Sequence, residues 1–207
     1  RLSRPAHDVE AETRRPAAAH APLDGGHVLD ARPLVRHDEM GAVEAGGQVV
    51  GGPFDIPEQG RGALLRDTVG AQFGLWQGSG HVGCEVVNEP GSLVRNDLVT
   101  PTPGPAREFY AAVFDFGLEG NKELPEADFT FLRRPDGHEV GGIFGNPAAQ
   151  GSTWNTVFEV ADTDEAVRRA RDAGGKSDDP FDMLYGRIAS MSDPFGTEFS
   201  VITRASG

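Results

Sequence analysis

The sequence predicts an α+β fold built from tandem β-α-β-β-β units. The main observation is an internal repeat, because motifs of the first half of the chain return in the same order 126 to 128 residues later. Composition agrees with this class, since 28 glycines and 15 prolines in 207 residues suit short strands joined by turns better than a helix bundle. A third unit with the same pattern lies between the two copies.

Four pairs of short motifs define the repeat. Ala-Gly-Gly at 45–47 returns at 173–175, Pro-Phe-Asp at 53–55 returns at 180–182, Gly-Arg at 60–61 returns at 186–187, and Asp-x-x-Gly-x-x-Phe at 67–73 returns at 193–199. The offset falls from 128 to 126 residues along the copy, as single-residue deletions in loops would produce. We therefore interpret the repeat as a duplicated structural unit.

The last copy shows the order of elements in one unit. Trp154–Val160 is rich in aromatic and β-branched residues and predicts a strand. Asp162 opens a helix with an acidic first turn, and Gly174 and Gly175 end it. Three short strands follow at 176–182, 186–192 and 197–203, the last two joined by the turn Asp-Pro-Phe-Gly.

The middle unit follows the same order. Leu93–Thr100 is predicted as a strand, and Pro103–Phe116 as a helix with prolines in its first turn, where backbone N–H groups have no helical partner. Phe129–Arg133 and Glu139–Phe144 then form a hairpin around the turn Pro-Asp-Gly.

The first 40 residues differ from the rest of the chain. They contain four of the six histidines and no sustained helical or strand period, so we expect no regular element before Gly41. Two explanations stay open. The segment is a disordered arm, or a GC-rich gene has been read out of frame up to about Gly41.

Charge and cysteine content argue against several classes of function. The formal net charge of -13 predicts a surface that repels phosphate backbones and anionic lipids, so we expect neither nucleic acid nor a membrane as a partner. The single cysteine, Cys84, and the lack of an apolar leader or membrane span predict a cytoplasmic protein. A Gly-x-Gly-x-x-Gly stretch occurs at 78–83, but the predicted linker at 81–90 and a strand at 93 follow it, not the helix that a dinucleotide site requires. The P-loop motif and the Gly-x-Ser-x-Gly motif of α/β-hydrolases do not occur.

Taken together, the motifs resemble those of the vicinal oxygen chelate superfamily, which includes glyoxalases, bleomycin-resistance proteins and extradiol dioxygenases. The sequence is most similar to a two-domain bacterial branch whose members are commonly labelled glyoxalase or hydroxylase. The resemblance covers about residues 41–204 and is carried by Pro-Phe-Asp-Ile-Pro at 53–57, Asp-x-x-Gly-x-x-Phe-Gly-Leu-Trp at 67–76, Asn-Glu-Pro-Gly at 88–91, Phe-Tyr-x-x-Val-Phe at 109–114 and Asp-Pro-Phe-Gly at 193–196.

The resemblance implies that two units pair to form curved mixed sheets around a concave pocket. It assigns an irregular or unreliable arm to residues 1–26, half of a first domain to 27–80, a linker to 81–90 and a complete second domain to 91–204. The first domain is then incomplete. Either its first half is corrupted or lost, or another chain completes it. Because unpaired strand edges promote association, we expect a homodimer.

Enzymes of this superfamily typically hold a divalent metal through four positions, on the first and last strands of the paired units. By the resemblance, three of these positions fall on Arg95, Asn155 and Ser200, and the fourth lies within Glu139–Ile143. Arginine does not ligate metals because it stays protonated, and asparagine and serine are weak ligands without carboxylates nearby. We therefore predict no metal and no other cofactor, with a divalent metal as the alternative.

Candidate site residues follow from the predicted strands. Arg95 and Asp97 share a strand face, so they form either an anion clamp with a base or a structural ion pair. With Glu139 they are the candidate catalytic residues. The candidate ligand-binding residues are Arg95, Asn155, Trp154, Glu159, Tyr185 and Ser200. For the two aromatic residues the alternative is a place in the core, and for Glu159 it is a solvated charge.

Two functions from different classes remain. The first is a metal-free protein that binds a small apolar or aromatic metabolite, in the manner of bleomycin-resistance proteins. The second is an enzyme, a hydroxylase, lyase or isomerase, that acts on a small oxygenated substrate with or without a divalent metal. The missing metal ligands favour the first.

Overall fold

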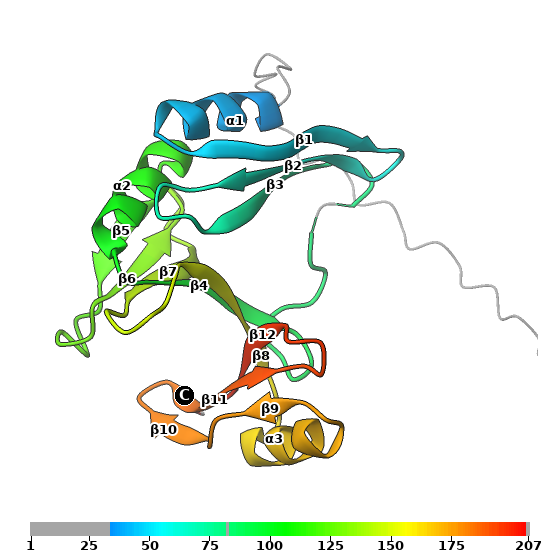
Figure 1. Ribbon diagram of the computed structural model, residues 1–207, viewed down its shortest axis with the longest axis vertical. Helices are drawn as coiled ribbons and strands as arrows, with labels where there is room; N and C mark the ends of the chain where they lie inside the picture. Colours follow the sequence, from blue (N-terminus) through cyan, green and yellow to red (C-terminus); the bar gives the residue numbers. More distant parts are fainter. Residues whose placement is uncertain (1–33, 82, 206–207) are drawn as a thin grey trace, which may run out of the picture. The chain divides into compact units, whose positions relative to one another are not determined.

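The computed structural model describes residues 34–81 and 83–205 (Figure 1). The predicted arm at 1–26 and the first residues of the predicted half-domain lie outside this part of the chain. No helix in the described part is long and apolar enough to cross a membrane.

The first described elements form a helix and a three-stranded antiparallel sheet. They are α1 (Leu34–Glu44), β1 (Gln48–Ile56), β2 (Gly60–Arg66) and β3 (Gln72–Gly78), with the strands in the order β1-β2-β3. Ala63 and Leu65 lie on either side of the exposed Leu64 on β2 and are buried in one cluster with Ala42 of α1. The expectation of no regular element before Gly41 was wrong, because α1 begins at Leu34.

The remaining strands form a mixed sheet in the order β10-β11-β12-β8-β4-β7-β6-β5, with β9 paired to β11. They are β4 (Leu93–Thr100), β5 (Gly117–Gly120), β6 (Phe129–Arg133), β7 (Glu139–Gly145), β8 (Thr153–Glu159), β9 (Lys176–Ser177), β10 (Phe181–Met183), β11 (Gly186–Ser192) and β12 (Glu198–Arg204). The helices of the two units are α2 (Pro103–Phe114) and α3 (Thr163–Asp172). This arrangement confirms an α+β fold with curved multistranded sheets (Figure 1).

The two units meet along β4 and β8, which pair antiparallel at the centre of the sheet. Asn96 lies opposite Thr156, sixty residues later, and the Thr156 hydroxyl donates a hydrogen bond to the Asn96 side chain at 2.8 Å. The helix N-caps, Thr102 and Asp162, have the same separation. The two units are therefore related by a local twofold axis near Asn96 and Thr156, which makes Arg95 the counterpart of Asn155.

The backbone confirms the internal repeat. Gly46 and Gly174 follow the helices of their units with φ of 94° and 88°, a conformation that glycine adopts without strain. Asp67 and Asp193 occupy the same turn in the two copies, because each carboxylate accepts hydrogen bonds from the backbone N–H groups two and four residues later. Repeated motifs thus mark repeated turns.

Three details differ from the sequence predictions. The middle helix ends at Phe114 because Asp115 has a left-handed backbone conformation, with φ of 55°. The short strand β5 was not predicted, and it pairs with β6. The strand expected at 176–182 is divided into β9 and β10, which pair with different parts of β11.

An aromatic core joins the three-stranded sheet to the middle unit. Phe73 of β3 contacts Phe109 and Tyr110 of α2 edge-on, with ring centroids 5.8 and 5.6 Å apart. A separate apolar cluster lies under α3, where Val167 packs with Met191 and Val201. The nine-stranded sheet contributes to both clusters and also carries the candidate site.

Candidate functional site

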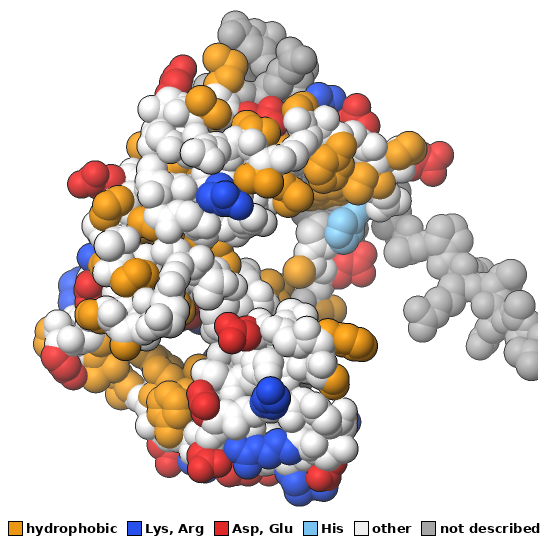
Figure 2. All heavy atoms as spheres, viewed as in Figure 1, with side chains coloured by type: hydrophobic (Ala, Val, Ile, Leu, Met, Phe, Trp, Pro, Cys, Tyr) orange, Lys and Arg blue, Asp and Glu red, His pale blue; other side chains and the backbone are white. Residues whose placement is uncertain are grey.

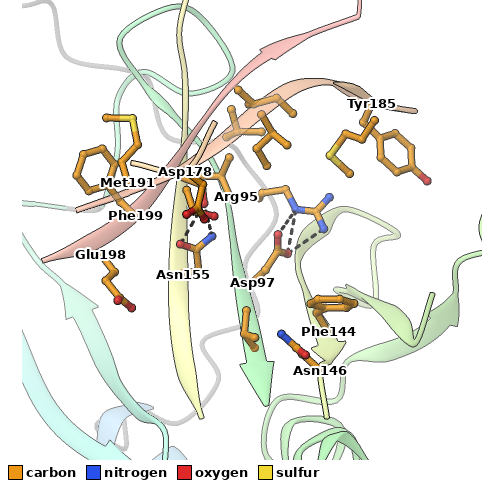
Figure 3. A pocket seen from close by; sticks show the side chains of 18 of the residues that line it. Arg95, Asp97, Phe144, Asn146, Asn155, Asp178, Tyr185, Met191, Glu198 and Phe199 are labelled. Carbon is orange, nitrogen blue, oxygen red and sulfur yellow. Dashed lines mark hydrogen bonds and ion pairs between the residues drawn. The ribbon is translucent and has the colours of Figure 1, made fainter. Parts of the chain in front are cut away.

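A cavity of about 760 Å³ lies against the central strands of the nine-stranded sheet (Figure 3). This volume is typical of small-molecule sites, which span roughly 300–1,000 Å³. Its walls come from both units, and most of its large side chains are aromatic or contain sulfur. They are Phe129, Phe131, Phe144, Trp154, Phe181, Met183, Tyr185, Met191 and Phe199.

Strand periodicity explains which polar side chains reach the cavity. Arg95, Asp97 and Val99 are spaced two residues apart on β4, and all three line it. Asn155 and Val157 do the same on β8, and the register places Asn155 opposite Asp97. The sequence prediction that Arg95 and Asp97 share a face agrees with this geometry.

Arg95 and Asp97 form a close ion pair on the cavity wall. The Arg95 Nε lies 2.9 Å from both carboxylate oxygens of Asp97, and its Nη2 lies 2.8 Å from Oδ1 (Figure 3). The guanidinium also lies over the rings of Phe129 and Phe131, 4.9 and 5.7 Å from their centroids. Burial raises the pKa of Asp97 above its ordinary value, although Arg95 and a hydrogen bond from the Gly142 backbone act in the opposite direction.

Glu139 is the third candidate catalytic residue, and it contacts Arg95 from the other side. The Arg95 Nη1 donates to Glu139 Oε1 at 3.1 Å. Glu139 does not line the aromatic cavity but a neighbouring one. Arg95 is thus shared between Asp97 inside the cavity and Glu139 outside it.

The other candidate ligand-binding residues divide into two groups. Asn155 and Ser200 line the cavity and bond to each other, with Nδ2 of Asn155 donating to Ser200 Oγ at 3.0 Å. Trp154 and Tyr185 line it with their rings and use their polar atoms elsewhere. Glu159, by contrast, is buried beside Arg204 as an ion pair and is not among the lining residues.

Trp154 and Tyr185 are held by hydrogen bonds to other parts of the fold. The indole N–H of Trp154 donates to the Tyr110 hydroxyl at 3.0 Å, and Tyr110 donates to Asp67 Oδ2 at 2.9 Å. The Tyr185 hydroxyl donates to Asn121 Oδ1 at 3.2 Å, which links the turn after β10 to the loop after β5. Asn121 also lines the cavity and was not identified from the sequence.

Several aromatic wall residues also escaped the sequence analysis. Phe129 and Phe131 were assigned only to a hairpin, yet the Arg95 guanidinium lies over both of their rings. Their separation by two residues on a strand is a signal for a shared face, and it could have identified them. Phe181 and Phe199 belong to the repeated motifs, which we interpreted only as structural.

The strand register fixes the fourth metal position of the family pattern. Ser200 of β12 lies opposite Val157 of β8, whose twofold counterpart is Asp97. The residue opposite Asp97 on β7 is Gly142, so this glycine takes the place that corresponds to Ser200. A Cβ at Gly142 would clash with the Phe129 ring, which rules out a larger side chain without rearrangement.

The four positions therefore carry arginine, glycine, asparagine and serine. Arg95 is a permanent cation and Gly142 has no side chain, while Asn155 and Ser200 are hydrogen-bonded to each other. This donor set does not fit a divalent metal. Within the described residues, no group of three or more His, Cys, Asp or Glu side chains could hold one either.

Comparison with known proteins assigns the chain to a family. A family model described as the Glyoxalase/Bleomycin resistance protein/Dioxygenase superfamily matches residues 92–201. "Putative glyoxylase CFP32" of Mycobacterium tuberculosis is 38% identical over 167 residues, which cover 79% of this chain and 63% of that protein. "Anthracycline biosynthesis protein DnrV" of Streptomyces peucetius is 36% identical over 170 residues, covering 79% of this chain and 60% of that protein. The chain thus spans about three-fifths of these relatives.

A solved structure shares the fold over most of the chain. The 2,2',3-trihydroxybiphenyl 1,2-dioxygenase of Sphingomonas wittichii strain RW1 superposes with a TM-score of 0.53 at 17% identity, covering 82% of this chain and 66% of that one. At this identity the likeness concerns the fold.

Proposed function

Because the chain belongs to the glyoxalase/bleomycin resistance protein/dioxygenase superfamily, we propose that residues 91–204 bind a small aromatic metabolite without using a metal. One observation carries the proposal. The cavity has aromatic walls, and its four metal positions hold Arg95, Gly142, Asn155 and Ser200, which suit hydrogen bonding and packing rather than metal ligation. We further propose that the protein acts in the cytoplasm, since its single cysteine is unpaired and exposed.

The walls favour a flat, polycyclic ligand. Ring-shaped ligands gain from offset and edge contacts with aromatic side chains, and Met183 and Met191 adapt to irregular outlines. The polar side chains orient such a ligand through its oxygen atoms, because Asn155 and the Arg95–Asp97 pair present donors and acceptors from adjacent strands. Two relatives are named for anthracycline biosynthesis, and this supports a hydroxylated polycyclic aromatic class.

Fluorescence of Trp154 offers a direct binding assay. The chain has two tryptophans, so Trp76→Phe leaves Trp154, on the cavity wall, as the only one, and excitation selective for tryptophan then reports on Trp154. We expect emodin, a trihydroxyanthraquinone, to quench this emission with saturation at one molecule per chain. Quenching without saturation, for emodin and for smaller hydroxynaphthoquinones, would contradict the proposal.

A matched pair of variants localises the bound ligand. Phe181 and Phe195 are both exposed phenylalanines in the last unit, but only Phe181 lines the cavity. Phe181→Ala should weaken emodin binding about three- to tenfold, the value of one aromatic contact. Phe195→Ala should leave the affinity unchanged, and equal effects of the two substitutions would place the ligand elsewhere.

Asp97 supports a second candidate function, acid–base catalysis on a small oxygenated substrate. A carboxylate in a cavity whose pKa is raised by burial is a typical general base, and Arg95 beside it could hold a substrate anion. In this case Asp97→Asn should abolish conversion of a bound hydroxyquinone, because the amide cannot accept the proton. Conversion at the wild-type rate by this variant would exclude Asp97 as the base.

A further inference from the structure

A second cavity of about 750 Å³ adjoins the aromatic cavity. Six residues line both cavities and form the boundary between the two spaces. They are Val94, Arg95, Asn121, Phe131, Tyr185 and Ile202. A ligand that fills the aromatic cavity therefore has a neighbouring space for a substituent on its Arg95 and Tyr185 side.

The second cavity differs from the first in chemistry. A continuous row of alternating charges runs along it from Arg95 to Lys122. Arg95 contacts Glu139 at 3.1 Å, Glu139 lies 3.7 Å from Arg133, and Arg133 contacts Glu119 at 2.7 Å. The Lys122 amine completes the row at 2.8 Å from Glu119.

The row is held in place by an aromatic ring. Phe131 lies between Arg95 and Arg133, and each guanidinium carbon is 5.7 Å from the centroid of its ring. Because the two guanidinium groups are fixed by both a ring and carboxylates, they present donors at defined positions at little cost in side-chain entropy. Such a surface is preorganised for hydrogen bonding.

The pairing of the charges indicates which chemical group fits. Along this row, a carboxylate or an amine on the ligand would have to compete with an ion pair already formed at Arg95, Arg133 or Glu119. Among the described residues that line the cavity, Glu123 is the one carboxylate outside the row. A hydroxyl group both donates and accepts, so it can bond to the remaining N–H groups and lone pairs without breaking a pair. A group with several hydroxyls uses many such positions at once.

We propose that the second cavity is a subsite for a neutral, hydroxyl-rich group, such as a sugar, attached to the aromatic ligand. The inference rests on the proposed function, because the aromatic part must occupy the first cavity. The proposed ligand is then an aromatic glycoside, a class that neither cavity indicates by itself.

Three related probes test the subsite in the Trp154 assay: emodin, its 8-O-glucoside and the corresponding glucuronide. We expect the glucoside to bind about tenfold more tightly than emodin, as one to three net hydrogen bonds would give. The glucuronide, which adds a carboxylate, should bind more weakly than the glucoside. A glucoside no tighter than emodin would overturn the subsite, and a glucuronide tighter than the glucoside would overturn its neutral character.

Arg133→Met separates the subsite from the aromatic cavity. Arg133 lines only the second cavity, and its removal leaves Lys122 beside Glu119 and Arg95 beside Glu139, so neither carboxylate loses its last cation. The variant should lose the preference for the glucoside and keep the affinity for emodin. The control is Arg168→Met on α3, since Arg168 also bridges two carboxylates but lies outside both cavities.

The outcomes distinguish the two proposals. If emodin and both conjugates fail to bind, the proposed function fails and the subsite with it. If emodin binds but Arg133→Met leaves the glucoside preference unchanged, or Arg168→Met removes it equally, the subsite assignment fails and the aromatic cavity stands.

Discussion

Tyr110 has a buried hydroxyl that serves two partners at the junction of the three-stranded sheet and the middle unit. It donates to Asp67 Oδ2 at 2.9 Å and accepts from the Trp154 indole at 3.0 Å. Tyr110→Phe keeps the ring contacts with Phe73 and Trp154 but removes both hydrogen bonds. The substitution therefore isolates the hydroxyl from the packing.

The expected loss in unfolding free energy follows from the two partners. A hydrogen bond to a charged acceptor contributes about 1.5–3 kcal/mol, and a buried donor left without a partner costs about 1–3 kcal/mol. Asp67 keeps the N–H groups of Val69 and Ala71, and Trp154 is only half-buried, so values near the lower limits apply. We predict a destabilisation of about 3 kcal/mol.

Urea unfolding measures this loss, followed by circular dichroism and by Trp154 fluorescence. At a slope of about 2 kcal/mol/M, the midpoint should fall by about 1.5 M. The control is Tyr185→Phe, which removes the other tyrosine hydroxyl in the chain. Its acceptor, Asn121 Oδ1, keeps two backbone donors, so the cost should stay under about 1 kcal/mol.

Two results would refute this reasoning. Equal losses for the two tyrosine variants would show that the Asp67–Tyr110–Trp154 network adds nothing beyond an ordinary hydrogen bond. A large loss for Tyr110→Phe seen only by fluorescence, with an unchanged transition by circular dichroism, would show that the hydroxyl affects only the surroundings of Trp154.

Four further predictions concern pH, metal and assembly. Burial raises the pKa of Asp97, so its contribution to stability falls as the pH rises from about 3.8 through the raised value, and Asp97→Asn removes that dependence in urea titrations at a series of pH values. Hydrogen bonds from the Thr197 and Phe195 backbone lower the pKa of Asp193, so Asp193→Asn should remove a contribution of the opposite sign, one lost as the pH falls below about 3.8. Dialysis after incubation with Mn, Fe, Ni or Zn salts should leave far less than one metal ion per chain by elemental analysis; near-stoichiometric retention would revive a metalloenzyme. We propose a homodimer, and light scattering at micromolar concentration should give twice the chain mass, with a monomer as the contrary result.

The elements that were predicted well from the sequence have turn residues at their ends. The predicted ranges of β4 and β11 agree with the structure because turn residues lie at their ends: Pro90 and Gly91 precede β4, Pro101 follows it, and the turn at 193–196 follows β11. β5 was missed because Gly-Leu-Glu-Gly has little strand propensity and depends on pairing with β6. The repeat held a signal for α1 that we did not use, since α3 precedes Gly174 as α1 precedes Gly46.

The site was predictable where it depends on one strand and not where it depends on register. Arg95 was located by the family resemblance and Asp97 by its place on the same strand face, and their ion pair agrees with one of the two interpretations left open. Gly142 could not be identified, because its place opposite Asp97 is set by the pairing of β4 with β7, which spacing along the chain does not determine. The link between Tyr185 and Asn121 joins loops 64 residues apart and has no local signal.

Matching positions in the two copies of the repeat show why the first copy does not form a cavity like that of the last unit. By the matched registers, Phe54, Ile56 and Trp76 correspond to Phe181, Met183 and Ile202 of the cavity wall. These three side chains are about two-fifths exposed, at 42%, 43% and 39%, and apolar side chains gather over β1–β3 in Figure 2.

Two serines of the cavity, Ser190 and Ser200, have no polar counterpart on the first sheet, whereas Ser192 and Glu198 at the strand ends correspond to Arg66 and Gln72. By the same registers, Gly74 and Leu64 stand where β12 and β11 have Ser200 and Ser190. Without these hydroxyls the middle of the sheet offers apolar contact and no side-chain group to orient a ligand at these two positions. A surface of this composition is better suited to cover by another apolar face, because about 25 cal/mol is gained for each Å² of apolar area removed from water. The chemistry of this face thus favours its role in the proposed dimer over a second ligand site.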